Sequence, residues 1–337
     1  MTDAQFTGPA WNLPEDDGLI FAATLDGRGG AELGDWSTVE NWRVNDAPVW
    51  LHLDRTSPRV QQWLRDDSGL TPITVEALLA EETRPRMFYG KRGTVAILRG
   101  VNTNPGANPE DMLSLRIWSD GQRIITLRHH RLQTPRDILT RYLEDQTGPE
   151  SIPSLFERLI TRLTERMAGV IHGFDDLLDE VESVLTTTEP LAARKRIRET
   201  RQDILILRRY MAPQRDAVAM LHAEPPKWLD ETDRLRLRET ANRLMQYVEE
   251  LDAARERASV LDDSIGNQMA EKMNKNMYVL SIIAAIFLPL GFVTGLLGIN
   301  VGGIPWAENT NGFLLTAICI GAIVGFEIVL FKFLKWI

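Results

Sequence analysis

The sequence predicts an α+β membrane protein with a cytoplasmic α/β domain, a long helical stalk and two C-terminal transmembrane helices. Three observations carry this prediction. The first 150 of the 337 residues alternate strand-like and helix-like segments. No proline interrupts the long helical pattern from Trp228 to Leu288. Two nearly uncharged apolar runs follow, at residues 278–299 and 313–331.

Residues 1–150 are predicted to form the α/β domain around a mixed sheet. Residues 18–27 and 47–54 have the composition of strands, and residues 112–130 have the pattern of a hairpin that turns at 119–122. Ser57 followed by Pro58 predicts a helix start, because serine caps a helix N-terminus and proline suits the first helical position.

Residues 151–227 are predicted to form antiparallel helices. Apolar residues recur every three or four positions in 155–185, which predicts one long amphipathic helix, and in 190–222, which predicts a second. Two prolines, Pro225 and Pro226, then break the chain. A third helix is expected to continue to residue 299, with residues 228–277 as its stalk part. Its roughly 70 residues would be about 105 Å long, which suggests a bundle.

The two apolar runs are predicted to cross a membrane, as residues 278–299 and 313–333. The first has no charge, and about 20 apolar residues suffice to cross the hydrocarbon core as a helix. Lysines precede the first run and follow the second, whereas the connection 300–312 has no Lys or Arg. Positive charge favours the cytoplasmic side, so both termini are expected there. A buried helical hairpin in a soluble protein is the alternative.

Composition narrows the class of function. A formal net charge of -9 argues against nucleic acid as a partner, because phosphate binding needs a basic face. The single cysteine excludes an intrachain disulfide. No secretory signal begins the sequence. No phosphate loop, His-Glu-x-x-His motif or nucleophilic triad is visible, so an enzyme is not expected.

One face of the long helix is predicted to line a pore. Two spans per chain cannot enclose a water-filled path, so either they only anchor the cytoplasmic domain or several chains assemble around an axis. Steps of three and four back from Gly298 select small, amide, hydroxyl and modest apolar residues: Gly295, Gly291, Leu288, Ala284, Ser281, Met277, Asn274, Ala270, Asn267 and Asp263. Their neutral dipoles suit a hydrated cation. A packing seam in which polar residues set the register is the alternative.

Two positions of this stripe have further candidate roles near the cytoplasmic mouth. Met277, with Leu280 or Ser281, is placed to close the pore by dewetting, although core packing explains the same residues. Asp263 is placed to collect cations, although a solvated stalk face explains it equally well.

The predicted outer end of the pore is the stretch around Asn300. A ring of amides offers carbonyl oxygens to a cation or to its hydration shell without a fixed charge that would trap it. The glycines Gly298, Gly302 and Gly303 permit the backbone turns needed there. A helix C-cap is the alternative for a Gly-Asn pair. The connection has one charge, Glu308, which is expected to concentrate cations at the entrance.

The order of these parts resembles the CorA superfamily of divalent-cation transporters. The resemblance rests on Gly298-Ile299-Asn300, on the preceding 287–298 with Pro289 and Gly295, and on residues 207–216. It implies a funnel-shaped homopentamer in a bacterial-type inner membrane, with the first spans around the pore and the outer selectivity site at Asn300. Most magnesium-transporting members have methionine where this chain has Ile299, and this departure is similar to the zinc-associated ZntB branch.

The sequence has no set of protein ligands that would bind zinc, as the transported substrate, tightly in dehydrated form. The five histidines are scattered outside the spans and the cysteine lies in the second span, so no ligand set at zinc spacing is visible and no cofactor is expected. A largely hydrated ion along amide and small-residue rings fits instead, with little discrimination among zinc, magnesium, cobalt and nickel. By resemblance to the magnesium-transporting relatives, Asp175, Asp176 and Asp179 are candidate metal contacts between chains; a solvated helix face is the alternative.

Proton coupling, which the resemblance implies for zinc uptake, has no obvious residue in the first span. It would have to use Glu327, the cytoplasmic domain or water; otherwise the membrane potential drives passive conduction. Three hypotheses remain at this point: a homopentameric zinc transporter, a CorA-like channel for magnesium, cobalt or nickel, and a membrane-anchored cytoplasmic scaffold or sensor.

Overall fold

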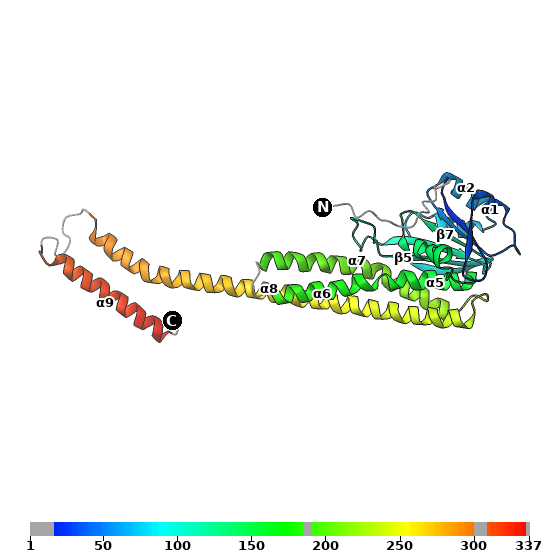
Figure 1. The fold of residues 1–337 in the computed structure, drawn as a ribbon. Helices are drawn as coiled ribbons and strands as arrows, with labels where there is room; N and C mark the ends of the chain where they lie inside the picture. Colours follow the sequence, from blue (N-terminus) through cyan, green and yellow to red (C-terminus); the bar gives the residue numbers. More distant parts are fainter. Residues whose placement is uncertain (1–16, 185–189, 300–308, 335–337) are drawn as a thin grey trace. The chain divides into compact units, whose positions relative to one another are not determined.

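The computed structural model describes residues 17–184, 190–299 and 309–334. Contacts divide the chain into two compact units, Met1–Asp262 and Asp263–Ile337 (Figure 1). The first unit contains the sheet and the helices packed with it, so the predicted 1–150 and 151–227 segments belong to one body. The second contains the end of the long helix and the last helix.

A seven-stranded mixed sheet forms the core of the first unit, as predicted. Its strands are β1 Leu19–Leu25, β2 Ala31–Gly34, β3 Val49–Asp54, β4 Arg86–Gly90, β5 Gly93–Gly100, β6 Leu113–Ser119 and β7 Arg123–Arg128, in the spatial order β2-β1-β3-β7-β6-β5-β4. The pair β3–β7 is parallel and every other pair is antiparallel. The predicted hairpin is β6–β7, and Gly121 takes φ 93° in its turn, a value that suits glycine.

Helices cover both faces of this sheet (Figure 1). On one face, α1 Trp36–Asn41, α2 Pro58–Asp66 and α3 Pro72–Leu79 share a buried apolar core with the strands. The predicted start of α2 is confirmed, since Ser57 Oγ accepts a hydrogen bond from Val60 N at 3.4 Å. On the other face lie α4 Gln133–Thr140, the π-helix η1 Arg141–Asp145 and α5 Ile152–Glu165.

The single helix predicted over 155–185 is wrong, because the structure has two, α5 and α6 Ala168–Val184. The break is one tightened turn, in which Met167 N bonds to Thr164 O at 3.0 Å. Thr164 contributes to it, since its hydroxyl donates to Ile160 O at 3.0 Å and such bonds bend helices. Apolar spacing continues across the turn, which is why the periodicity did not reveal it.

The remaining helices follow the predictions closely. They are α7 Pro190–Ala223, α8 Glu231–Leu297 and α9 Gly312–Phe333. Asp230 caps α8 by accepting a hydrogen bond from Asp233 N at 2.7 Å. The helix begins at Glu231, three residues after the predicted start at residue 228. Charged pairs hold α7 to α8 within the first unit: Arg194 Nε lies 2.7 Å from Asp262 Oδ1, and Arg208 Nη2 donates to Asp252 Oδ2 at 3.0 Å.

Candidate ion path

The predicted stripe is an exposed face of α8. Every predicted member that the structure describes is exposed in the single chain: Asp263, Asn267, Asn274, Met277, Leu280, Ser281, Ala284, Leu288, Gly291, Gly295 and Gly298. No other described element of the chain covers them. These side chains are therefore free to meet water or a neighbouring chain.

The opposite face of α8 is the one that the second unit partly buries. Its partly buried residues are Ile282, Ala285, Ile286, Leu290 and Val293. At 100° per residue, Ala285 lies beside the stripe and the other four lie across the helix from it. On α9 the covered positions also recur every three or four residues: Gly312, Thr316, Ile320, Ile323, Val324, Glu327 and Phe331. Figure 1 shows α9 running back beside the end of α8, and the partly buried positions form one face on each of the two helices.

The polar groups of the stripe are neutral dipoles between residues 267 and 281. Ser281 donates its hydroxyl to Met277 O at 2.8 Å, which leaves the lone pairs of its oxygen as acceptors. Asn267 and Asn274 make no hydrogen bond to any described residue, so their amides are available to water or to a hydrated ion. Asp263 supplies one carboxylate at the start of the second unit.

The helix ends two residues before the predicted limit of residue 299. The last α8 residue is Leu297, and Gly298 N bonds back to Thr294 O at 2.9 Å and to Gly295 O at 3.2 Å. Ile299 is 47% exposed. Asn300 and Glu308 lie outside the described residues, so their roles in selectivity and at the entrance stay predictions.

Glu327 is the carboxylate of the second predicted span. Its side chain lies on the covered face of α9 with 9% exposure, and its Oε2 is buried without a hydrogen-bond partner among the described residues. The carboxyl therefore faces α8 rather than the outside of the unit.

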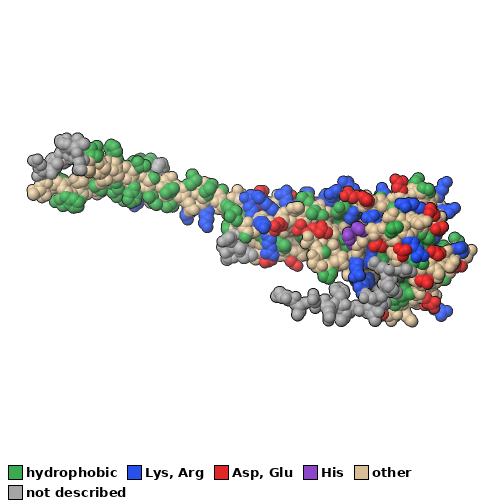
Figure 2. All heavy atoms as spheres, turned by 90° about the horizontal axis from the view of Figure 1, so that it is seen from above, with side chains coloured by type: hydrophobic (Ala, Val, Ile, Leu, Met, Phe, Trp, Pro, Cys, Tyr) green, Lys and Arg blue, Asp and Glu red, His purple; other side chains and the backbone are tan. Residues whose placement is uncertain are grey.

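Both apolar helices are long and apolar enough to cross a membrane, and most apolar side chains of the second unit are exposed in the single chain. Figure 2 shows hydrophobic side chains over the unit that they form, whereas Lys, Arg, Asp and Glu crowd the surface of the sheet-containing unit. An exposed apolar surface of this extent needs lipid or protein around it.

The predicted acidic contacts lie on α6. Asp179 Oδ1 is 2.6 Å from Arg257 Nη2 of α8, while Asp175 is half-buried and Asp176 is exposed. Within the described residues, no three His, Cys, Asp or Glu side chains are grouped to hold a metal ion. Metal binding by the three aspartates stays a prediction, and Asp179 already has a cationic partner.

Three of the histidines occupy defined positions in the sheet-containing unit. His52 is buried beside Thr126 Oγ1, 2.8 Å from its Nδ1, and burial lowers the pKa of His52 to about 3. This imidazole is neutral at physiological pH and closed to solvent ions. His129 and His130 follow β7 directly, with ring centroids 4.1 Å apart.

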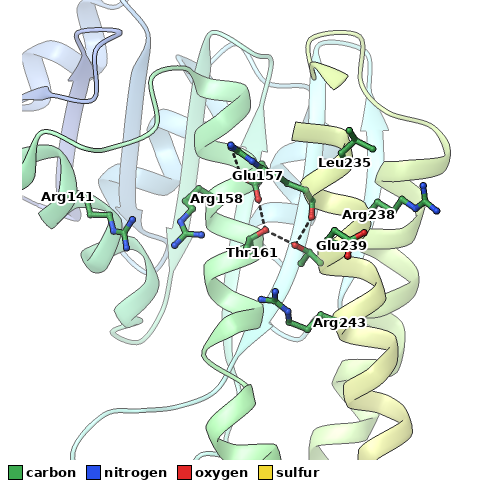
Figure 3. A pocket seen from close by; sticks show the side chains of 10 residues that line it. Arg141, Glu157, Arg158, Thr161, Leu235, Arg238, Glu239 and Arg243 are labelled. Atoms are coloured by element: carbon green, nitrogen blue, oxygen red, sulfur yellow. Dashed lines mark hydrogen bonds and ion pairs between the residues drawn. The ribbon is translucent and has the colours of Figure 1, made fainter. Parts of the chain in front are cut away.

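Sequence reasoning missed a pair of buried carboxyls, Glu157 on α5 and Asp233 on α8. Figure 3 shows Glu157 with its neighbour Thr161. Glu157 accepts from the hydroxyl of Thr161, which lies 2.6 Å from the hydroxyl of Thr240 across the interface. Asp233 accepts from Ser154 Oγ at 3.2 Å. Burial raises the pKa of both carboxyls, and Arg236 Nη1 is 3.9 Å from each. The pair joins two helices beside a cavity of about 650 Å³ and is no part of the α8 stripe.

Known proteins share this architecture. The family model described as CorA-like Mg²⁺ transporter protein matches residues 45–335. The chain belongs to the CorA-like family. Among its relatives, the divalent cation transporter CmaX of Pseudomonas aeruginosa is 40% identical over 97% of this chain and 99% of the relative. The zinc transport protein ZntB of Yersinia enterocolitica is 33% identical over 90% of this chain and 91% of that protein.

Solved structures agree with the fold of this CorA-like chain. The structure of full-length CmaX covers 96% of the chain and is itself wholly covered, with a TM-score of 0.83 and 40% identity. The CorA magnesium transporter of Methanocaldococcus jannaschii covers 94% of the chain and is covered over 98%, with a TM-score of 0.78 at 17% identity. At that identity the likeness shows the fold alone.

Proposed function

We propose that this CorA-like chain is a homopentameric divalent-cation transporter of a bacterial-type inner membrane, with zinc as its preferred cargo and both termini in the cytoplasm. The observation that carries the proposal is the exposed stripe of α8, which lies opposite the face packed against α9. Copies that place this stripe toward a common axis would enclose a path of small and amide side chains. The descriptions of the relatives as cation transporters support this use rather than an enzymatic one.

The proposed mechanism moves a largely hydrated ion. The stripe holds amides, a hydroxyl, glycines, two alanines and a few larger apolar side chains, and among its described members only Asp263 is charged. Such groups exchange hydrogen bonds with the water around the ion and do not hold it tightly, so the ion can leave again. Met277 and Leu280, which are exposed on this face, are proposed to close the path by excluding water.

Zinc is favoured over magnesium by the ZntB relative and by the departure at Ile299. The CmaX relative and the Mg²⁺ description of the family model favour a broader cation channel as the second candidate. Purified protein in liposomes with an internal zinc indicator tests the proposal, and parallel liposomes with a magnesium indicator test the second candidate. We expect uptake of zinc above that of empty liposomes. No uptake of either ion would leave a membrane-anchored scaffold as the function.

An imposed pH gradient separates coupled from passive transport. With proton coupling, inward protons stimulate zinc uptake, and Glu327→Gln removes that stimulation if the buried carboxyl carries the proton. With passive conduction, only the membrane potential changes the rate, at about 2.3 kcal/mol per charge per 100 mV.

A further inference from the structure

A second cavity, of about 920 Å³, lies in the first unit between the β5–β6 region of the sheet and α7. Five arginines line it: Arg55, Arg84, Arg99, Arg116 and Arg209. None of the ion pairs within the described residues includes any of the five. The cavity therefore gathers positive charge that carboxylates at contact distance do not neutralise.

Arg116 is the deepest of these cations. Its side chain projects from β6 with 1% exposure, and it donates only to backbone carbonyls, from Nη1 to Leu78 O and from Nη2 to Glu81 O at 3.4 Å. Its Nε is buried without an acceptor in the part of the chain that the structure describes. Burial and the neighbouring arginines lower the pKa of Arg116 to about 10. Such a buried cation is unusual, because burying a charge without an opposite charge is costly.

Arg99 repeats this arrangement on β5. Its guanidinium donates to Met112 O at 2.8 Å and to Thr83 O at 3.0 Å, and its Nε is also buried without an acceptor. Thr83 and Ser114 line the same cavity, and their hydroxyl oxygens are buried without a hydrogen-bond partner among the described residues. Four donor groups around one cavity thus lack an acceptor. Buried polar groups in native proteins nearly always have one, so their clustering points to a missing ligand.

The same donors define the chemistry of that ligand. Guanidinium and hydroxyl groups bind oxyanions, and a phosphate offers several oxygens that can accept from them at once. Glu81, Glu82, Glu110 and Asp111 also line the cavity, and none of them forms an ion pair with the five arginines within the described residues. A phosphate is therefore attracted by the arginines and repelled by these carboxylates, and the contacts that distinguish it from chloride are the several hydrogen bonds its oxygens accept.

We propose that this cavity binds a phosphate group between Arg99, Arg116, Thr83 and Ser114. The group belongs either to inorganic phosphate or to a nucleotide, and the volume lies within the range of small-molecule sites. Arg209 and Tyr210 bring α7 into the wall of the cavity. The preceding residue, Arg208, is ion-paired with Asp252 of α8. A phosphate bound in this cavity would therefore contact α7, the helix that forms this ion pair with α8.

Calorimetric titration of the full-length protein in detergent tests this site, at constant ionic strength in sodium chloride. One arm adds inorganic phosphate and the other adds ATP without divalent cations. We expect saturable binding in at least one arm, and the arm that binds more tightly identifies the source of the phosphate. Arg116→Gln should weaken binding at least tenfold, whereas Arg65→Gln, on the exposed side of α2, should leave it unchanged.

A second variant covers the case in which Arg116→Gln does not fold. Ser114→Ala removes an unpartnered hydroxyl, so it should leave the melting temperature of the unliganded protein unchanged or higher while weakening binding several-fold. Absence of binding in both arms, or equal affinity of wild type and Ser114→Ala, would overturn the proposal. These outcomes do not depend on ion transport.

Discussion

One residue after the end of α8, Asn300, is proposed to be the first polar group that an arriving ion meets. The residues before Asn300 are glycine and isoleucine, so its amide is the first strongly polar side chain after the helix ends. A neutral amide can replace water in the hydration shell of an ion at little cost, whereas a carboxylate would hold the ion.

Replacing Asn300 by alanine should therefore reduce zinc flux several-fold and leave assembly intact. The matched control is Asn311→Ala, in the same connection, because Asn311 makes no side-chain cap bond at the start of α9. Flux is measured in the liposome assay and assembly by the mass of the purified protein. Equal flux in wild type and Asn300→Ala would remove this residue from the selectivity site.

Asp203 on α7 makes stability depend on pH. Burial, with the nearby charges of Glu110, Glu199 and Asp111, raises its pKa from 3.8 to about 6. The folded state therefore binds this proton more tightly than the unfolded state does. The stabilisation is present below about pH 4 and is lost as the pH rises through about 6.

The melting temperature of wild type, relative to that of Asp203→Asn, should accordingly fall between pH 4 and pH 6. Subtracting the variant removes the opposite effect of Asp252 and Asp262, whose pKa values their arginine partners lower. Asp66→Asn, at an exposed position of α2, should keep a constant difference from wild type. A constant difference for Asp203→Asn as well would contradict the prediction.

At the scale of elements, the sequence predicted one helix over residues 155–185, whereas the structure has a turn between α5 and α6. Local periodicity indicates which face of a helix is buried. Both helices bury an apolar face with the same spacing, so the tightened turn between them does not change the apolar pattern of the sequence. The charges that anchor the end of α5 are visible only in three dimensions. Asp137 of α4 accepts from Arg162 Nη2 at 3.0 Å and from Arg166 Nη1 at 2.8 Å.

Asp137→Ala should lower the free energy of unfolding by about 1 kcal/mol, since these charge-assisted bonds are partly exposed to solvent. Asp145→Ala is the matched control, because Asp145 is exposed at the end of η1. Denaturant unfolding measures both variants. Equal stability of the two would show that the anchor contributes nothing.

The exposed face of α8 can be tested by filling it. Ala284→Phe adds a large ring to the stripe and should reduce transport by at least tenfold, because the ring would fill space that the small alanine leaves open to the ion. Ala322→Phe adds the same ring at an exposed position of α9 and should transport normally. If both variants transport equally, the stripe does not line the path.

At the scale of the whole molecule, the second unit exposes surface that lipid, water or another chain must cover. Its apolar helices expose their most apolar stretches, and the polar stripe of α8 has no cover within the described chain. Lipid can cover apolar side chains but not amides, so the stripe needs water or another chain.

The purified protein should therefore have the mass of five chains in mild detergent. Native mass spectrometry measures this directly. Asp145→Ala serves as a folded control with the same expected mass, and a monomer would contradict the proposed pore. A stable trimer or tetramer would correct the number of copies and leave the stripe as the candidate lining.

The sequence by itself determined the elements whose signals are local. The uncharged runs predicted both apolar helices, prolines and caps set the limits of α2, α7 and α8, and the stripe followed from steps of three and four along one helix. Only the tertiary structure decided what depends on residues far apart. The parallel pairing of β3 with β7 and the Glu157–Asp233 pair each join residues 74 or more positions apart. The arginine cavity brings together residues from separate segments between Arg55 and Tyr210. The periodicity of the sequence does not predict these long-range contacts, because strand order and helix docking are set by the packing of the whole domain.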